Sequence, residues 1–268
     1  MHIAITVRNM GPQSSLGILS ECAREAETAG FESLWITDHI AIPPDDSEGS
    51  NGRYLDPLVT LGFLAGITRR IKLGTGVLIL PYRPALPTAK QIATLQELSA
   101  GRLLLGAGIG WMDAEFRALG LDRRQRGADS DAVLEFLNRC FASDTVSANG
   151  QEFLFRPKPG RPPIYIGGAA KNALPRAVAH DAGWMPMGIE PHRLAGDIEH
   201  YHQLCAEADS KPRGITVLRG LPLEDRQSAL EIVDGYRQLG VERLVCACRY
   251  DNAEEFSIQA AALAELRF

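Results

Sequence analysis

The chain has 268 residues, of which 45% are hydrophobic, a formal net charge of −5 and a pI of about 5.7. This length suits one domain of the α/β-barrel class, which runs to about 250 residues, and no linker or low-complexity segment divides the chain. The acidic balance argues against a nucleic-acid or anionic-membrane partner. The sequence lacks a signal-peptide pattern and a membrane-length apolar run, so we expect a cytoplasmic protein.

Five cysteines are scattered along the chain, and their odd number argues against a disulfide framework. Cys246 and Cys248 lie two apart in an apolar stretch that favours a strand, which would place both thiols on one face. Cysteine is often buried, and no Cys/His cluster has a zinc-binding spacing. We therefore interpret this pair as small buried thiols and predict no metal site.

Strand and helix patterns alternate from one end of the chain to the other. Gly30 is typical of a helix end, and Asp56 followed by Pro57 is typical of a helix start. The first half predicts strands at residues 2–7, 33–37, 71–80 and 103–106, and helices at 16–29, 56–68, 86–98 and at least 129–141. The second half predicts an exposed strand at 151–155, strands at 163–166, 184–187, 215–218 and 244–247, and helices at 172–181, 191–208, 224–239 and 253–266.

Leaving the exposed strand aside, eight strands alternate with helices, which implies a parallel sheet with right-handed crossovers. Eight such units at this length favour a closed (β/α)8 TIM barrel, with an open doubly wound sheet as the alternative. We predict a single α/β barrel domain over residues 1–268 with short insertions at the carboxyl-terminal rim. The polar segments 40–55 and 144–162 are expected to contact substrate there.

The strand ends carry the candidate chemistry, because ligands of parallel α/β folds bind at the carboxyl ends of strands. Asp38 and His39 follow the second strand, where an acid can orient and tune an imidazole; a helix-cap Asp beside a surface His is the alternative. Gly74 and Gly76 near the end of the third strand indicate either backbone lying against a ligand or space for a bulky neighbour.

Two further glycine-rich segments follow strands. The G-x-G-x-G run at 106–110 is not the dinucleotide fingerprint, but its N–H groups suit an anion. The run from Gly167 to Lys171 precedes a helix start and offers free N–H donors at the positive end of a helix dipole. Trp111 suits either a ligand wall or the core, whereas Trp35 is predicted to be core.

Five segments together resemble the luciferase-like flavin and deazaflavin enzymes, which share a (β/α)8 barrel. The resemblance is greatest to the branch of probable coenzyme F420-dependent oxidoreductases. The segments are WITDH at 35–39, LGTGVLILPYR at 73–83, AKQIATLQELSAGRLLLGAGIGW at 89–111, RRQRG at 123–127 and PPIYIGGAAKNALPRAVAHDAGWMPMG at 162–188.

This resemblance implies a cofactor ring in the barrel mouth, against a non-prolyl cis peptide bond at Gly76–Val77. It implies that Asp38 and His39 lie near the reacting edge of the ring, where His39 exchanges a proton. We expect Asp38 to set the orientation of His39. Trp111 lies beside the ring at a position where some relatives carry a Glu, so this chain lacks one proposed acid. The phosphate tail would be held by the backbone of Gly108, Gly110, Gly167, Gly168 and Ala169.

The resemblance therefore implies an F420-dependent oxidoreductase that transfers hydride to or from a small organic substrate, with a homodimer as the expected assembly. Candidate contacts for the polyglutamate tail of F420 are Lys171, Arg176, Arg69 and Arg83. One alternative is an FMN-dependent monooxygenase supplied by a separate flavin reductase. An alternative of another class is a non-catalytic barrel that binds flavin or deazaflavin.

Overall fold

The computed structural model describes residues 1–45 and 50–267, so residues 46–49 of the predicted polar loop lie outside the described residues. The strands are β1 (His2–Thr6), β2 (Ser33–Ile36), β3 (Lys72–Ile79), β4 (Leu103–Gly108), β5 (Thr145–Ala148), β6 (Gln151–Leu154), β7 (Ile164–Gly167), β8 (Gly183–Met185), β9 (Thr216–Arg219) and β10 (Arg243–Cys246). The α-helices are α1 (Leu16–Thr28), α2 (Pro57–Ile67), α3 (Ala85–Leu98), α4 (Asp113–Ala118), α5 (Arg126–Ala142), α6 (Ala170–Ala179), α7 (Pro191–Glu207), α8 (Arg226–Gln238) and α9 (Ala253–Ala264).

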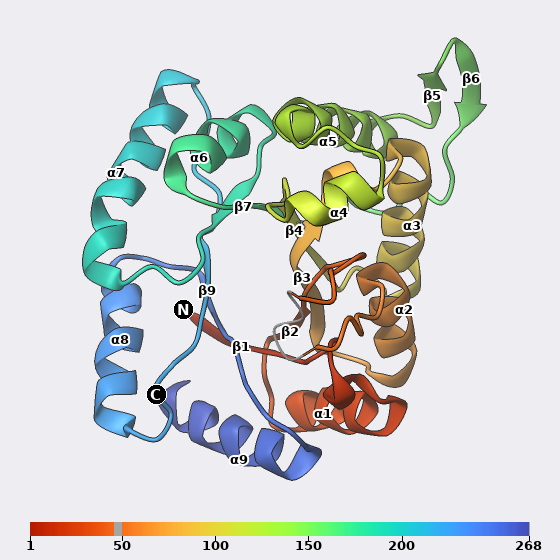
Figure 1. The fold of residues 1–268 in the computed structure, drawn as a ribbon. Helices are drawn as coiled ribbons and strands as arrows, with labels where there is room; N and C mark the ends of the chain where they lie inside the picture. Colours follow the sequence, from red (N-terminus) through yellow and green to blue (C-terminus); the bar gives the residue numbers. More distant parts are fainter. Residues whose placement is uncertain (46–49, 268) are drawn as a thin grey trace.

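Eight strands form one parallel sheet in the order β8-β7-β4-β3-β2-β1-β10-β9, with the helices packed around its outside (Figure 1). Parallel bridges at Trp184–Ile215 and Met187–Leu218 join the two end strands. These bridges close the sheet into a barrel. The predicted (β/α)8 fold is therefore confirmed, and the alternative of an open doubly wound sheet is wrong.

Local sequence signals place the helix ends where we expect them. The Asp56 carboxylate accepts a hydrogen bond from the Val59 N–H at 3.0 Å, and Pro57 occupies the first turn of α2. Gly30, just after α1, has a φ of +77°, a conformation in which a side chain at Cβ is strained. The five cysteines are buried and free, as expected for Cys246 and Cys248.

The inside of the barrel is filled by side chains that need a glycine beside them. Trp35 is fully buried, and a Cβ at Gly74 would lie 2.2 Å from Cδ2 of its indole ring. No side chain tolerates this approach, so Gly74 makes space for a bulky neighbour rather than for a ligand. Both the prediction for Trp35 and this alternative for Gly74 are confirmed.

An ion network lies at the amino end of the barrel. The Arg243 side chain is 2% exposed and donates hydrogen bonds from all three of its nitrogens. Its acceptors are the carboxylate of Glu32 at 2.8 and 2.9 Å, Glu242 at 3.0 Å, the Tyr165 hydroxyl at 3.0 Å and the Thr216 hydroxyl at 3.1 Å. All five N–H donors of the guanidinium are thus satisfied within the protein.

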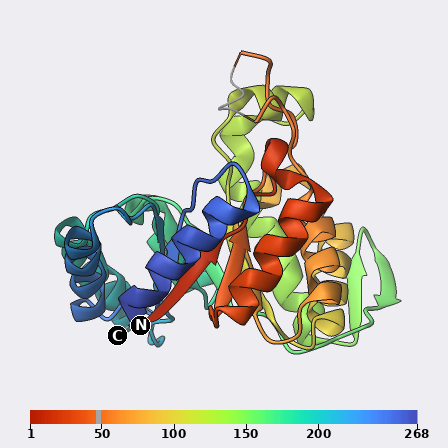
Figure 2. The same cartoon turned by 90° about the horizontal axis from the view of Figure 1, so that it is seen from below.

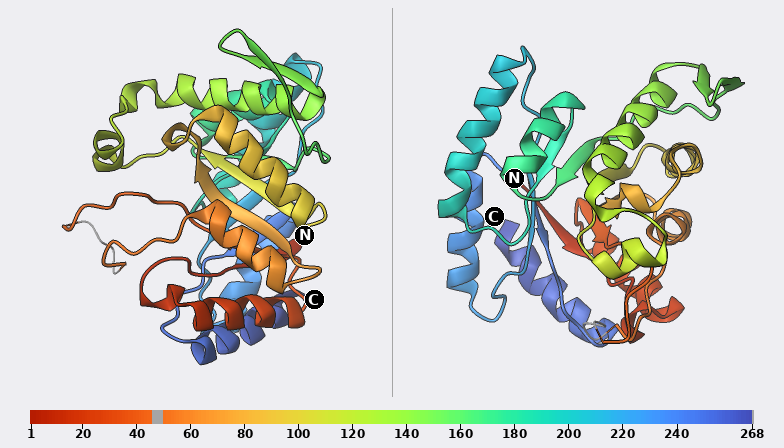
Figure 3. Two further views of the ribbon diagram at one scale, coloured as in Figure 1. Left: turned by 90° about the vertical axis from the view of Figure 1, so that its right-hand side faces the viewer. Right: turned by 45° about the horizontal axis from the view of Figure 1, so that its top comes forward.

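The insertions of the barrel lie at both ends. The segment after β2 and the stretch from α4 to the start of α5 project together at the carboxyl end, away from both chain termini (Figures 2 and 3). The β5–β6 hairpin instead lies between α5 and β7 in the chain. A segment between a helix and the next barrel strand lies at the amino ends of the strands, so the hairpin is at the end opposite the carboxyl rim. The prediction that residues 144–162 contact substrate at the rim is therefore wrong.

In the part of the chain that the structure describes, we find no helix with the length and apolar character needed to span a membrane.

Candidate functional site

A cavity of about 400 Å³ lies in the barrel mouth, at the carboxyl ends of β2, β3, β4 and β7. The ends of these four strands meet here, as a closed parallel barrel requires, and Arg126 and Met187 come from two further segments. All of the predicted site residues except Ala169 line the cavity; Ala169 is the exposed N-cap residue of α6. The other lining residues are Thr37, Ile79, Ile109, Arg126 and Met187.

The wall of the cavity is built around Val77. The peptide bond between Gly76 and Val77 is cis, as the resemblance implies. A Cβ at Gly108 would lie 2.3 Å from Val77 Cγ2, and one at Gly167 would lie 2.7 Å from Val77 Cγ1. These two glycines therefore make room for Val77. Gly168 differs, because open space surrounds its Cβ position and its φ is +124°, so its backbone is accessible from the cavity.

His39 is held by a buried carboxylate from α4. Its Nδ1 lies 2.9 Å from Oε2 of Glu115, whose side chain is 0% exposed. A carboxylate only accepts hydrogen bonds, so this contact places a proton on Nδ1. Glu115 also accepts the hydroxyl of Tyr82 at 2.8 Å and two backbone N–H groups, of Ile40 at 2.5 Å and of Ala41 at 3.0 Å. Glu115 therefore ties His39 to the loop that follows it.

Glu115 is ionised at neutral pH. Burial alone would raise the pKa of this carboxyl, but the hydrogen bonds from His39, the two backbone N–H groups and Tyr82 outweigh burial and lower the pKa to about 2. A fixed negative charge beside the imidazole holds the orientation of the ring, with Nδ1 toward Glu115. The site can therefore carry a proton to and from the cavity.

Asp38 has a different partner from the one that the sequence analysis predicts. The Arg83 guanidinium donates to both of its oxygens, at 2.6 and 2.9 Å, and the Ile79 N–H donates at 2.8 Å. Burial lowers the pKa of Arg83, but Asp38 and Asp56 outweigh it and raise that pKa. Asp38 thus anchors the end of β3, and Glu115, not Asp38, orients His39. The expected orienting role of Asp38 is corrected accordingly.

Aromatic side chains frame the His39 edge of the cavity. Tyr54 and Trp111 make edge-to-face contacts with the imidazole, with ring centroids 5.0 and 6.0 Å away. Trp111 is 55% exposed, so it forms a cavity wall and does not belong to the core. Trp184 is fully buried, and its indole N–H donates to the Gly168 carbonyl at 2.9 Å, which fixes the backbone at the opposite side of the cavity.

The four cations proposed for a polyglutamate tail lie in different places. Arg83 is engaged by Asp38, and Arg176 by Asp131, with 2.5 Å between Nε and Oδ1. Arg69 lies between α2 and β3, at the amino end of the barrel. Lys171 stands exposed in the first turn of α6. Lys171 alone of the four remains a candidate at the mouth.

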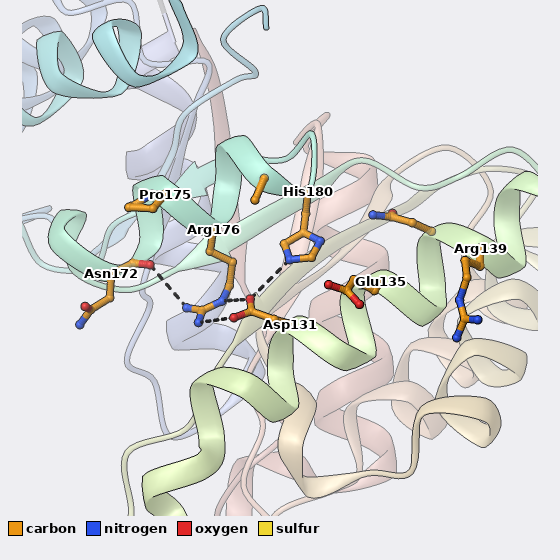
Figure 4. A pocket seen from close by; sticks show the side chains of 9 residues that line it. Asp131, Glu135, Arg139, Asn172, Pro175, Arg176 and His180 are labelled. Atoms are coloured by element: carbon orange, nitrogen blue, oxygen red, sulfur yellow. Dashed lines mark hydrogen bonds and ion pairs between the residues drawn. The ribbon is translucent and has the colours of Figure 1, made fainter. Parts of the chain in front are cut away.

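A larger hollow, of about 910 Å³, lies between α5 and α6 on the outside of the barrel (Figure 4). Arg176 and His180 both point toward Asp131 there, and His180 Nε2 lies 3.4 Å from its Oδ1. Of the residues singled out from the sequence, only Arg176, a candidate for the polyglutamate tail, lines this hollow. Asp131, Arg176 and His180 are bonded to one another across the contact between α5 and α6. The mouth cavity remains the candidate site.

The comparisons with known proteins agree with the fold. The profile of the luciferase-like monooxygenase family matches residues 1–267. The chain belongs to this family. An uncharacterised Mycobacterium tuberculosis protein is 31% identical over 267 residues, which cover 90% of this chain and 91% of that protein.

One relative in sequence and one solved structure of similar fold carry named activities. A 5,10-methylenetetrahydromethanopterin reductase from Methanolobus tindarius is 34% identical over 161 residues, covering 58% of this chain and 45% of the reductase. Among solved structures, an F420-dependent secondary alcohol dehydrogenase in complex with an F420-acetone adduct has a TM-score of 0.79 at 16% identity, covering 100% of this chain and 99% of that one. The structural likeness establishes the shared barrel.

Sequence reasoning missed Glu115 and Arg126 as residues of the luciferase-like site. Glu115 follows Trp111 by four positions and was visible only as the last residue of a G-x-G-W…E pattern. Arg126 lies in the RRQRG segment, which carried the resemblance without an assigned role. Their contacts depend on α4 and on the turn before α5, and the alternating strand and helix pattern predicts neither.

Proposed function

We propose that this protein is an F420-dependent oxidoreductase that binds the deazaflavin ring in the mouth cavity and passes hydride to a small organic acceptor. The observation that carries the proposal is His39, held by the ionised Glu115 and facing a cavity beside Gly76–Val77. The F420-dependent dehydrogenase that shares this fold supports the same choice of cofactor.

The cavity suits a flat ring with an anionic tail. Its walls are apolar where a ring would lie, and no carboxylate without a partner faces it among the described residues. The apolar side chains are Val77, Ile79, Ile109, Trp111 and Met187. Gly168 opens its backbone toward the cavity just before α6, where the N–H groups and the helix dipole favour an anion.

When bound and reduced, F420 supplies a hydride, and reduction of a carbonyl or alkene acceptor requires one proton as well. His39 donates that proton from Nε2, the ring nitrogen that Glu115 does not hold. The donating ring carries a proton on each nitrogen; Glu115 orients it and keeps the remaining proton on Nδ1 once Nε2 has given up its own. Asp38 and Arg83 bond to each other, so they hold the loop and exchange no proton. Trp111 shields the reacting edge from water.

Cofactor binding by the purified protein tests the proposal. We expect F420 to bind with a Kd in the micromolar range or below and FMN to show no binding, by fluorescence titration of each cofactor. The reverse result overturns the F420 assignment and favours the FMN-dependent monooxygenase, which the family description also allows. Binding without turnover on a broad panel of acceptors would favour the non-catalytic barrel. The homodimer stays a prediction, which sedimentation velocity tests.

A further inference from the structure

An acceptor in the mouth cavity must lie next to His39, because the proton of the proposed reaction comes from Nε2 of this ring. Side chains packed against the imidazole therefore border the acceptor as well. Glu115 holds Nδ1 at 2.9 Å. The rings of Tyr54 and Trp111 make edge-to-face contacts with the imidazole, with centroids 5.0 and 6.0 Å away. An acceptor bonded to Nε2 is thus expected to lie beside aromatic rings.

Trp111 is exposed, whereas the other two tryptophans of the chain are not. Trp35 and Trp184 are fully buried, and Trp111 is 55% exposed at the cavity. Ile40, which follows His39, is 44% exposed. A tryptophan side chain can bury roughly 150–250 Å² of surface, and large apolar side chains exposed together mark a surface that binds an apolar ligand. The cavity edge beside His39 therefore offers a hydrophobic surface to the acceptor.

The two carboxylates nearest to His39 in the chain and in its hydrogen bonds are buried and paired. Glu115 accepts hydrogen bonds from His39, from Tyr82 and from two backbone N–H groups. Asp38 is bonded to both terminal nitrogens of Arg83. Neither carboxylate presents a free charge to the acceptor. A charged substituent on the acceptor would lose water against the indole surface, so this edge favours an uncharged molecule.

Arg126 also lines the cavity, but it belongs to another side of the mouth. It stands in the first turn of α5, and Arg176 of α6 donates to the carbonyl of the next residue, Gly127, at 3.3 Å. α6 follows β7, and the sheet order puts β3 and β4 between β7 and β2. His39 follows β2, so the positive charge of Arg126 lies toward β7 and away from the proton carrier.

We propose that Trp111 selects an uncharged carbonyl compound, whose hydrocarbon substituent lies on the indole ring while its oxygen faces Nε2 of His39. This inference rests on the proposed function, because it names the acceptor of that reaction. Hydride from the reduced cofactor forms a C–H bond at the carbonyl carbon, the π bond of the carbonyl breaks, and the oxygen takes the Nε2 proton. The products are an alcohol and the oxidised cofactor.

The fluorescence of Trp111 tests acceptor binding without turnover. Because the other two tryptophans are buried, quenching by acrylamide reports mainly on Trp111. The probes are 2-heptanol, the product of 2-heptanone reduction, and 6-hydroxyheptanoate, in which a carboxylate replaces the terminal methyl group. On protein loaded with its ring cofactor, we expect 2-heptanol to protect Trp111 from the quencher. The charged probe should need an at least about tenfold higher concentration, because its carboxylate must lose water.

Turnover of a series of methyl ketones tests the role of Trp111 in selection. From acetone through 2-pentanone to 2-heptanone, we expect kcat/KM to rise by about two- to fourfold for each methylene that leaves water. Trp111→Ala should lower this gain to below about 1.5-fold per methylene, whereas Trp111→Phe should retain most of it. The gain compares substrates with the same reacting group, so a general loss of activity does not change it.

Leu98→Ala is the matched control. Leu98 is a large apolar side chain that is 75% exposed, but it ends α3 and lies at the amino end of the barrel. We expect the gain per methylene in this variant to equal that of the unchanged protein. Thermal unfolding of each variant checks that the fold is intact.

The outcomes separate this inference from the proposed function. If the protein binds a ring cofactor and reduces ketones, but Trp111→Ala keeps the full gain per methylene, the inference is wrong while the proposed function stands. A preference for 6-oxoheptanoate over 2-heptanone also overturns it and would indicate that Arg126 recognises the acceptor. Protection of Trp111 without reduction of any ketone overturns the carbonyl assignment. If the protein binds neither F420 nor FMN, the proposed function itself fails.

Discussion

Each end of the barrel contains an arginine shielded from solvent, and the two arginines differ in their hydrogen-bond partners. At the amino end, every N–H of Arg243 has a protein acceptor, and Glu32 supplies a bidentate carboxylate. At the carboxyl end, Arg126 makes a single hydrogen bond within the described residues and keeps a buried Nε without a partner. One end is electrostatically complete without a ligand and the other is not.

This difference separates a structural end of the molecule from a binding end. In barrels of this class, groups at the amino ends of strands serve stability and groups at the carboxyl ends serve function. Each end also contains a carboxylate with a lowered pKa, Glu32 beside Arg243 and Glu115 beside His39. Substitutions at the amino end should therefore change stability, and substitutions at the carboxyl end should change binding and turnover.

The largest effect is expected at the mouth, from His39→Asn. This change removes the proton carrier but keeps a polar side chain of similar width. We expect turnover to fall by about 100- to 10,000-fold, the usual contribution of a positioned acid or base, while cofactor affinity stays within threefold. Stopped-flow reoxidation of the reduced cofactor with an acceptor from the panel measures the first quantity and fluorescence titration the second. Full turnover of the variant would exclude His39 from the mechanism.

The next effect is expected at the opposite end, from Arg243→Met. The substitution leaves Glu32 half-buried without its bidentate partner, so we expect unfolding to become easier by about 3–5 kcal/mol, measured by urea denaturation. Lys72→Met is the matched control: Lys72 also contacts Glu32, but it is 44% exposed, and the loss should stay below about 1 kcal/mol. A loss of similar size in both variants would show that the Arg243 network is not the stabilising element.

The sequence predicted the structural features that depend on neighbouring residues. Asp56 with Pro57, and Gly30, mark helix ends by local rules, and the alternation of patterns is enough to infer eight strands. The partner of His39 is different, because Glu115 lies 76 residues further along the chain and reaches it only through α4. Adjacency in sequence favoured Asp38, which Arg83 occupies instead.

The placement of residues 144–162 was wrong for a reason that the sequence itself contained. The polar character of this insertion favours a rim loop, but the insertion follows a helix and precedes a strand, so it must lie at the amino end. Arg126 is a different case. A pattern of residue types shows that an arginine is present, but the absence of a protein acceptor appears only when its surroundings are known.

Acid should destabilise both ends in the same pH range. In the folded protein, burial raises the pKa of Glu32, but Arg243 and Lys72 outweigh it and lower the pKa to about 2, the same value as for Glu115. A carboxyl with a lowered pKa stabilises the fold above its ordinary value, near 4.5, and loses that contribution as the pH falls toward 2. Each group should contribute up to about 3 kcal/mol.

Unfolding free energies from urea titrations between pH 6 and 2.5 measure this loss. Glu32→Gln and Glu115→Gln should each reduce the stability lost between pH 6 and 2.5. The reductions should add in the double variant, because the two sites lie at opposite ends of the barrel. An unchanged acid profile in both single variants would contradict the assignment of these two carboxylates.

The smallest effect distinguishes the two ends with one chemical change. Tyr82→Phe and Tyr165→Phe each delete a buried hydroxyl that completes a network, the first bonded to Glu115 at 2.8 Å and the second to Arg243 at 3.0 Å. Each should cost about 0.5–1.5 kcal/mol of stability, measured by urea denaturation. Tyr82→Phe should also shift the pH dependence of turnover, because Glu115 loses a donor and changes its hold on His39. Tyr165→Phe should leave that profile unchanged. A shift in both variants, or in neither, would mean that the two ends are not electrostatically separate.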